Sequence, residues 1–293
     1  MPWQKLGRIF AAHGQKPWMQ THASMPLAHH LEGDTFRIYF SPRDSQNQSY
    51  VGCFDIDINN PLQPFNLSDG PVLPPGSPGA FDEHGVMPSW ILVEDNRPIL
   101  YYIGWQRQDD VPFRLSIGKA DLSSTQPTRE VVMTHPCLVS TPCLLQDAGM
   151  YRMWHMIGLG WQGDNWPPYN VQLSESKDGT TWTSYSQPAI DFAYPGECAI
   201  ARPSVLKEAG GYKMWYSYRG ISFPYKIGYA ESADGITWSR QDDTVSLHAA
   251  DDPEAWDHEM VAYPYVFQHK GDKYMLYSGN GFGQGGLGIA VMR

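Results

Sequence analysis

The chain has 293 residues, of which 42% are hydrophobic and 13% are aromatic, and its formal net charge is −10. This acidic balance argues against a nucleic-acid partner, because phosphate binding needs a basic surface. The first residues lack the apolar core of a signal peptide, and no segment approaches the roughly 18 apolar residues of a membrane span. Four cysteines without CxxC spacing, Cys53, Cys137, Cys143 and Cys198, are typical of free thiols, so we expect a cytoplasmic protein.

A strand-like segment, 3–10, opens the chain and has no partner close by in the sequence. After it, a unit of three or four short strands repeats. Each unit starts with an apolar strand that contains a proline, and the spacings between these prolines are 62, 54, 61 and 61 residues. The prolines are Pro26, Pro88, Pro142, Pro203 and Pro264.

The rest of each unit is equally regular. A turn leads to an aromatic strand, at 36–41, 99–105, 151–158, 212–219 and 274–280. A third strand follows and carries a glycine near its start in four units, at Gly52, Gly118, Gly228 and Gly288, whereas the strand at 171–176 lacks one. Asp234-Gly235 marks a tight hairpin in the best-formed unit, because glycine readily adopts the positive φ of such turns.

Repeats of this size and strand content predict an all-β fold, a single five-bladed β-propeller over residues 1–293. The blades are expected at about 20–73, 82–135, 136–190, 197–247 and 256–293. The last unit has only three strands, so we expect segment 3–10 to complete that blade and close the ring. The third blade contains an insertion, 158–169, whose two tryptophans and two prolines suggest a wall or lid.

In such a blade, the residues before the proline and the second hairpin lie at the same face, near the axis. The segments before the prolines contain the carboxylates Glu83, Glu197 and Glu259 and the histidines His22, His84 and His258. Clustered carboxylates raise one another's pKa, which can provide one protonated acid beside an ionised base. The alternative is that these carboxylates cap loops or pair with Arg43, Arg202 and Arg219.

The arginines and aromatic residues leave similar alternatives open. Arg202 is either a structural partner of Glu197 or a bidentate ligand of a substrate carboxylate or phosphate. Arg43 and Arg219 occupy equivalent hairpin tips, which favours a role in ligand binding. Most aromatic residues are explained as core, but a few near the axis are candidates for stacking on a sugar: Trp105, Trp161, Trp166, Tyr218, Tyr263 and Phe282. The histidines show no HxH or HExxH spacing, so we expect no metal and no cofactor.

Several segments carry a family resemblance that covers essentially the whole chain: FDEHGVMPS (81–89), AIARPSV (199–205), MWYSYRG (214–220) and WDHEMVAYPYVF (256–267). They resemble the five-bladed propellers of glycoside hydrolase families 32, 43 and 130, and more closely the glycosidase-like proteins encoded beside bacterial polysaccharide genes. The resemblance implies an axial sugar site, with Glu83 or its neighbour Asp82, Glu197 and Glu259 at the matching positions. The hydrolases usually have a catalytic aspartate on the first inner strand, where this sequence has His22.

The leading functional prediction is therefore a glycan-active enzyme that cleaves a glycosidic bond. Glu197 is predicted as the acid, Glu83 or Asp82 as the base, and Glu259 as a residue that tunes their pKa or holds sugar hydroxyls. The predicted substrate-binding residues are His22, Arg43, His84, Trp161, Arg202, Arg219, His258 and Tyr263. One alternative is a glycoside phosphorylase, in which the three arginines and a histidine bind phosphate, and the other is a non-catalytic sugar-binding propeller in polysaccharide metabolism.

Overall fold

The computed structural model describes residues 2–124, 127–161 and 166–293, and almost all of its regular structure is β-strand. The helical segments in these ranges are the short turns η1 (Asp242–Thr244) and α1 (Asn280–Gly283). None of the described helices is long and apolar enough to cross a membrane. The all-β prediction is confirmed.

The strands follow one another as antiparallel meanders. The first two meanders consist of β2 (Thr21–Glu32), β3 (Thr35–Arg43) and β4 (Gly52–Asp57), then β5 (Gly85–Glu94), β6 (Arg97–Gln106), β7 (Arg114–Asp121) and β8 (Arg129–Met133). The next two consist of β9 (Val139–Asp147), β10 (Met150–Gly158), β11 (Tyr169–Ser176) and β12 (Thr183–Ser184), then β13 (Glu197–Glu208), β14 (Gly211–Gly220), β15 (Lys226–Ser232) and β16 (Ser239–Arg240). The last one consists of β17 (Ala262–His269), β18 (Asp272–Ser278) and β19 (Leu287–Met292), joined by β1 (Gln4–Phe10).

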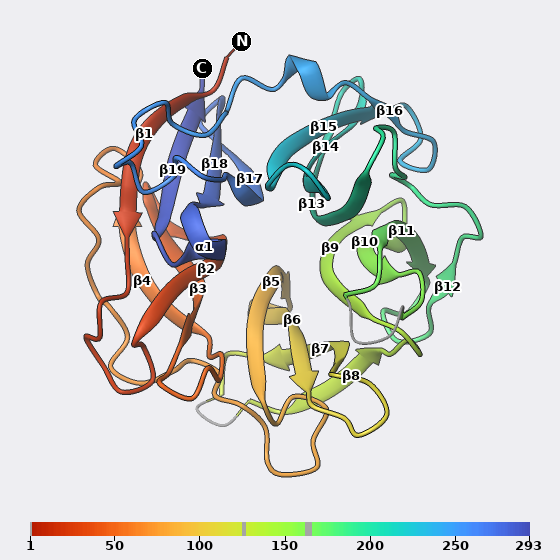
Figure 1. Cartoon of the computed structure of the whole chain (residues 1–293), viewed down its shortest axis with the longest axis horizontal. Helices are drawn as coiled ribbons and strands as arrows, with labels where there is room; N and C mark the ends of the chain where they lie inside the picture. The colour runs from red at the N-terminus through yellow and green to blue at the C-terminus, as the bar shows by residue number, and fades with distance from the viewer. Residues whose placement is uncertain (1, 125–126, 162–165) are drawn as a thin grey trace.

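Figure 1 shows these meanders side by side around a central axis, in a propeller-like arrangement. The third and fourth meanders belong to one hydrogen-bonded sheet, because Tyr169 and Ala199 form a single parallel pair between them. The first strand of each meander contacts the first strands of its neighbours, and β17 contacts β2 in the same way. The first strands therefore surround the axis.

The two ends of the chain meet in one sheet. β1 pairs antiparallel with β19, from Gln4 opposite Val291 to Phe10 opposite Leu287. Just before β1, Trp3 is 93% buried and packs edge-on against Trp215, with ring centroids 5.9 Å apart. Lys5 Nζ lies 2.5 Å from the buried carboxylate of Asp257. The opening segment is thus held by strand pairing, packing and an ion pair.

The repeated third-strand glycine has a packing explanation. Gly118 lies opposite Tyr102 and Gly228 lies opposite Tyr216. A Cβ atom at Gly228 would come within 2.4 Å of the Tyr216 ring, and one at Gly118 within 2.8 Å of the Tyr102 ring. Glycine therefore makes room for the aromatic ring of the second strand to lie across the third.

The landmark prolines mark a recurrent bulge in the first strands. The residues immediately before four of them have left-handed φ values, 52° at Met25, 49° at Thr141, 55° at Arg202 and 57° at Tyr263. Each of these strands shifts register with its neighbour at this point. Because a bulge re-aims the side chain it contains, and non-glycine residues seldom adopt positive φ, these positions are candidates for function.

Candidate functional site

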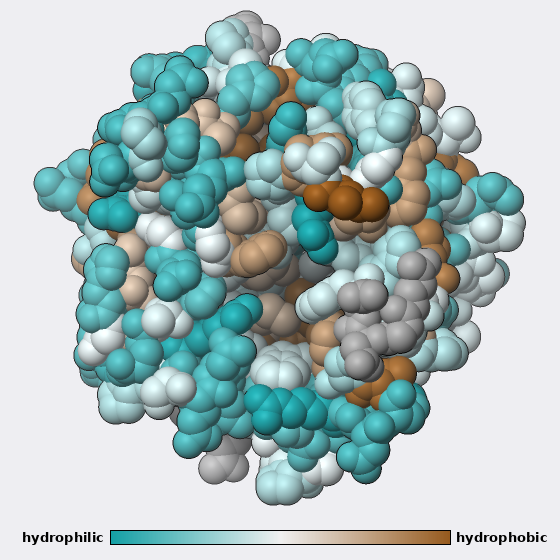
Figure 2. All heavy atoms as spheres, in the orientation of Figure 1, coloured by the Kyte–Doolittle hydropathy of each residue, from teal (hydrophilic) through white to brown (hydrophobic). Residues whose placement is uncertain are grey.

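The face seen in Figure 2 is hollowed near its centre, where the first strands converge. An apolar cluster below this hollow takes residues from every meander, among them Met25, Ile103, Met156, Ala201 and Ala262. Half-buried side chains that pack on the cluster, with the arginines beside them, form what we call the axial hollow. It is defined by Arg43, Met87, Trp105, Phe113, Trp161, Arg219, Tyr225 and Tyr263.

A cavity of about 220 Å³ lies within the axial hollow. Its lining combines aromatic rings with one cation and a few polar groups: Arg43, Asn47, Ser49, Met87, Trp105, Phe113, Leu115 and Trp166. Indole and phenyl rings beside hydrogen-bonding groups are suited to a ligand with one apolar face and many hydroxyls, as a sugar has.

Tyr263 occupies the middle of the axial hollow. Its backbone N–H donates to Ser217 Oγ (2.7 Å), which holds the bulged residue, and its ring centroid is 5.7 Å from that of Tyr225. Burial and then the nearby Tyr169 raise the pKa of Tyr263, and the charges of Arg43, Arg219 and Arg202 act in the opposite direction. The charges of three arginines from three different strands therefore act on one phenol.

Arg219 and two tyrosines form one side of the hollow. The guanidinium group stacks over the Tyr225 ring, with its carbon 5.4 Å from the ring centroid, and the hydroxyls of Tyr225 and Tyr169 are hydrogen bonded to each other. Arg219 Nε is buried without a hydrogen-bond partner among the described residues. This side therefore offers a stacked cation with donor capacity left over.

Arg43 forms the opposite side, near His22. Arg43 Nη1 donates to Asn47 Oδ1 (2.9 Å), and His22 Nδ1 lies 2.8 Å from Thr21 Oγ1. Burial and then the charge of Arg43 lower the pKa of His22 to about 4. At neutral pH, His22 is therefore an uncharged imidazole beside a guanidinium group.

Arg202 forms the floor of the hollow and is only 1% exposed. Its Nη1 donates to the carbonyl and hydroxyl oxygens of Ser89 (both 2.7 Å), and its Nη2 donates to the carbonyl oxygen of Pro26 (2.8 Å). The side chain thus crosses from β13 to β5 and β2, and burial lowers the pKa of Arg202 to about 10. The predicted option that Arg202 pairs with Glu197 is wrong, because all of its acceptors are uncharged.

Glu197 instead pairs with an arginine from the outermost strand of its own meander. Its Oε1 accepts from Arg240 Nη2 (2.8 Å), and its Oε2 accepts from Arg240 Nη1 (3.0 Å) and from the backbone N–H groups of Ala193 (2.7 Å) and Tyr194 (3.3 Å). The side chain is fully buried. Four donors thus converge on this buried carboxylate inside its own meander, and we interpret Glu197 as a structural residue rather than the catalytic acid.

Asp82 is held in a similar way. Its buried carboxylate accepts from the Tyr102 hydroxyl (2.9 Å) and from Arg129 Nη1 (2.7 Å). The same aspartate–tyrosine–cation arrangement occurs in two other meanders, as Asp242 with Tyr216 and Arg240, and as Asp257 with Tyr277 and Lys5. Because it recurs at strand junctions of three meanders, we interpret it as a structural clamp.

Glu83 and His84 lie together where the second meander begins. Glu83 accepts from the Gly79 backbone N–H (2.6 Å) and from Gln106 Nε2 (2.9 Å), and these two bonds hold its pKa below the usual range. His84 Nδ1 is 3.4 Å from Glu83, and its ring centroid is 5.6 Å from that of Trp105. Glu83 is therefore an ionised acceptor close to the aromatic lining.

Glu259 has the fewest side-chain contacts among the four predicted catalytic carboxylates. It is exposed, and no hydrogen bond or ion pair joins its side chain to the described residues, whereas its backbone N–H donates to Asn280 Oδ1 (2.8 Å). Asn280 begins α1, which extends toward the centre of the view in Figure 1. The neighbouring His258 is held to the preceding loop through Ala250 O (2.7 Å). The Glu259 side chain is therefore unpaired among the described residues and lies beside α1.

The insertion of the third meander borders the hollow on another side. Trp161 packs edge-on against Phe113, with centroids 5.3 Å apart, and Trp166 packs on the same ring at 4.6 Å. Residues 162–165 of the predicted wall lie outside the described residues. The described tryptophans form a wall against the second meander.

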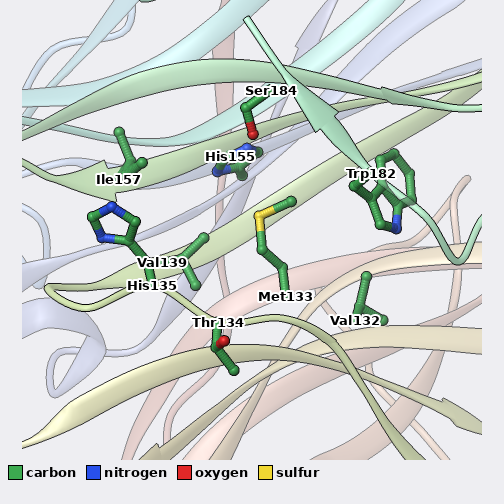
Figure 3. A pocket seen from close by; sticks show the side chains of 9 residues that line it. All are labelled: Val132, Met133, Thr134, His135, Val139, His155, Ile157, Trp182 and Ser184. Atoms are coloured by element: carbon green, nitrogen blue, oxygen red, sulfur yellow. The ribbon is translucent and has the colours of Figure 1, made fainter. Parts of the chain in front are cut away.

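A second cavity of about 280 Å³ lies away from the hollow, between the segment after β8 and strands β10 and β12 (Figure 3). His155 is fully buried there, and its Nε2 is 2.8 Å from Ser174 Oγ, which in turn lies 2.8 Å from Ser184 Oγ. Burial lowers the pKa of His155 to about 4. The imidazole is thus an uncharged, hydrogen-bonded part of the core.

The predicted site residues thus separate into groups. Arg43, Arg219 and Tyr263 meet in the axial hollow, with Arg202 as its floor, and Trp161 and His84 at its border. The described residues contain no group of three histidine, cysteine or carboxylate side chains placed to hold a metal. The sequence analysis missed Met87 and Phe113 of the lining and the two tyrosines Tyr169 and Tyr225. The tyrosines occupy the same place in two repeats, at the start of β11 and just before β15, so aligning the repeats position by position would have found them.

Comparisons with known proteins extend this picture. No family model matches the chain. It is 38% identical over 301 residues to "Uncharacterized protein MT1551" and, equally, to "Uncharacterized protein Rv1502", from two strains of Mycobacterium tuberculosis, covering 100% of this chain and 99% of each relative.

Solved structures match over nearly the full length at low identity. A glycosyl hydrolase from Bacteroides ovatus has a TM-score of 0.75 at 15% identity, covering 99% of this chain and 94% of that one. A thermostable family-43 glycoside hydrolase has a TM-score of 0.70 at 16% identity, covering 92% and 89%. A structure described as "The GH130 family of mannoside phosphorylases contains glycoside hydrolases that target beta-1,2 mannosidic linkages in Candida mannan" has a TM-score of 0.71 at 15% identity, covering 99% and 93%. At these identities the likeness concerns the fold, which is that of glycosidase-like propellers.

Proposed function

Since the chain belongs to the family of the mycobacterial proteins MT1551 and Rv1502, whose names state no activity, we propose its function from its own site: it binds a glycan in the axial hollow and cleaves a glycosidic bond there. The observation that carries this proposal is the lining of the hollow, where Trp105, Phe113 and Tyr225 lie among arginine and tyrosine donors. The glycoside hydrolases of similar fold support it as an analogy.

The proposal includes the finer architecture. We infer five blades, with the third and fourth meanders as separate blades joined by one pair, and a ring closed by β1 as the fourth strand of the last blade. The β1–β19 pairing and the contact of β17 with β2 support this interpretation.

We assign the catalytic carboxylates to Glu83 and Glu259. Cleavage needs one carboxyl group that protonates the leaving oxygen and another that activates water or stabilises the cationic transition state. Glu83, whose hydrogen bonds favour the ionised form, suits the base, and the unpaired Glu259 suits the acid. The predicted roles of Glu197 and Asp82 pass to these residues, because Arg240 and Arg129 already occupy those two carboxylates.

The test is a screen of oligosaccharides for cleavage products by mass spectrometry. Once a substrate is found, Glu259→Gln and Glu83→Gln are expected to abolish turnover. Glu259→Gln should leave the melting temperature unchanged, and Glu83→Gln should lower it slightly, because Glu83 accepts two hydrogen bonds. Glu254→Gln is the matched control, because this glutamate is also exposed and lies in the same loop as Glu259. Full turnover by Glu259→Gln would refute the assignment of the acid.

A second candidate is a sugar-binding propeller without catalytic activity. It is favoured by the ion pairs of Glu197 and Asp82, which make two of the four predicted catalytic carboxylates structural. It predicts glycan binding that survives both Glu259→Gln and Glu83→Gln, with no product after long incubation.

A further inference from the structure

The arginines around the axial hollow lack the carboxylate partners that arginines have elsewhere in this protein. Away from the hollow, Arg37, Arg129, Arg152 and Arg240, which are at least half-buried, each pair with an aspartate or glutamate. None of the ion pairs in the described ranges includes Arg43, Arg202 or Arg219. The chain has 31 acidic residues against 21 basic ones, so a shortage of acids does not explain this.

The hydrogen bonding of these arginines is also incomplete. Arg202 donates only to uncharged oxygens of Ser89 and Pro26, and Arg219 stacks on Tyr225. The Nε atoms of Arg202 and Arg219 are buried without a partner among the described residues. The rest of the Arg219 guanidinium group has only the uncharged hydroxyls of Tyr169 and Tyr225 as hydrogen-bond partners. Buried polar groups are rarely left unsatisfied, so the unpartnered Nε of Arg219 and the lack of a carboxylate beside it point to an absent acceptor.

The three charges also act on the same space. Each guanidinium charge acts to lower the pKa of Tyr263, although the three arginines come from β3, β13 and β14. Guanidinium groups remain charged in proteins, and a charge in a low-dielectric environment interacts more strongly with a counter-charge than it does in water. An anion that entered the hollow would therefore be attracted by the guanidinium charges of Arg43, Arg202 and Arg219 together.

We propose that the axial hollow is an anion-recognition site, in which Arg43 and Arg219 contact a phosphate, sulfate or carboxylate group of the ligand and buried Arg202 adds its field from below. That the anionic group accompanies a glycan rests on the proposed function, whereas the anion site itself does not. The group has two possible sources, an acidic substituent on the sugar or free inorganic phosphate used as a co-substrate.

The role of each group follows from its place. Arg43 lines the cavity and Arg219 stacks on Tyr225 beside Tyr263, and both are half-buried, so they can approach an oxyanion directly. Arg202 is closed off by Ser89 and Pro26 and acts only through its charge. Uncharged His22 beside Arg43 contributes a hydrogen bond and no repulsion toward the cation.

Binding of four probes tests the proposal: inorganic phosphate, glucose 1-phosphate, glucuronate and uncharged methyl glucoside, measured by calorimetry with the full chain at low and high salt. At least one anionic probe is expected to bind more tightly than methyl glucoside, and its affinity should fall as the salt concentration rises. Arg43→Gln or Arg219→Gln should weaken that probe at least tenfold, and Arg219→Lys should weaken it less. Arg107→Gln is the matched control, because the side chain of this exposed arginine lies over the Trp105 ring and its contact with His84 is made by the backbone N–H, which the substitution keeps.

The outcomes separate the proposals. Binding of inorganic phosphate alone supports the anion site with free phosphate as the source, and binding of the acidic sugars alone supports an acidic glycan. If wild-type protein binds no anionic probe, or if the folded Arg43→Gln and Arg219→Gln variants bind as wild type does, the anion site is refuted. Cleavage of uncharged glycans by a protein that binds no anionic probe would leave the proposed function standing and refute this inference. Anion binding without any cleavage would support the anion site and refute the proposed function.

Discussion

Replacing Glu197 by glutamine tests whether this residue is structural or catalytic. The substitution changes one carboxylate oxygen into an NH₂ donor inside a fully buried site where four donors already converge. The amide is best placed with its NH₂ at the Oε1 position, which has a single partner, Arg240 Nη2. One charge-assisted hydrogen bond is then lost and two donors oppose each other.

The cost is limited because Arg240 keeps its second carboxylate, Asp242 at 2.7 Å. Losing a hydrogen bond to a charged group and leaving the donor unsatisfied costs about 2–4 kcal/mol. For a chain of this length we expect the melting temperature to fall by about 5–10 °C. Urea unfolding at pH 7 should show a lower midpoint with an unchanged slope.

A double-mutant cycle with Arg240→Gln makes the test specific. The two substitutions should couple by more than about 1 kcal/mol, because the residues share one contact. Glu259→Gln provides the comparison, since that exposed side chain has no described partner and its loss should leave stability unchanged. If Glu197→Gln melted with wild type and lost only turnover, the structural interpretation would be refuted.

Three further predictions concern the fold. Deleting residues 1–10 removes the buried Trp3 and Ile9 and leaves Asp257 without Lys5. Large buried side chains contribute about 2–5 kcal/mol each, against about 5–15 kcal/mol for a whole domain, so circular dichroism should show no cooperative melting. A truncated chain that melts like the full one would contradict this prediction. Gly228→Ala places a methyl group 2.4 Å from the Tyr216 ring and should destabilise by about 1–3 kcal/mol in urea, whereas Gly210→Ala, with nothing within 4 Å of its Cβ, should not. Burial lowers the pKa of His155 from 6.5 to about 4, so unfolding takes up a proton as the pH falls. His155 should therefore contribute about 3 kcal/mol to the loss of stability between pH 6.5 and 4, and His155→Gln should remove that part of the pH dependence while the part due to His22 remains.

The strand pattern could be predicted because it depends on local signals. Proline and the aromatic strand recur in all five units and the third-strand glycine in four of them, and the packing of Gly228 against Tyr216 explains the glycine there. The pairing of β1 with β19 followed from counting strands in the last unit.

The electrostatic partners could not be predicted, because they depend on which side chains the outer strands turn inward. Arg240 is 43 residues from Glu197, and Arg129 is 47 residues from Asp82. Spacing from the prolines placed these carboxylates in register but did not distinguish an acid facing the hollow from one clamped inside its own meander. One signal was present, since the aromatic–aspartate pairs Phe81-Asp82 and Trp256-Asp257 occupy the same place in two repeats.

The left-handed residues before the prolines have a consequence for protein engineering. Met25, Thr141, Arg202 and Tyr263 share one backbone conformation although their side chains differ completely in size and charge. The backbone bulge is thus compatible with very different side chains at this position, while the residue that follows it is a proline in each strand. Randomising Tyr263, the half-buried member of this set, with the buried Met25, Thr141 and Arg202 kept, would change ligand preference on a constant scaffold.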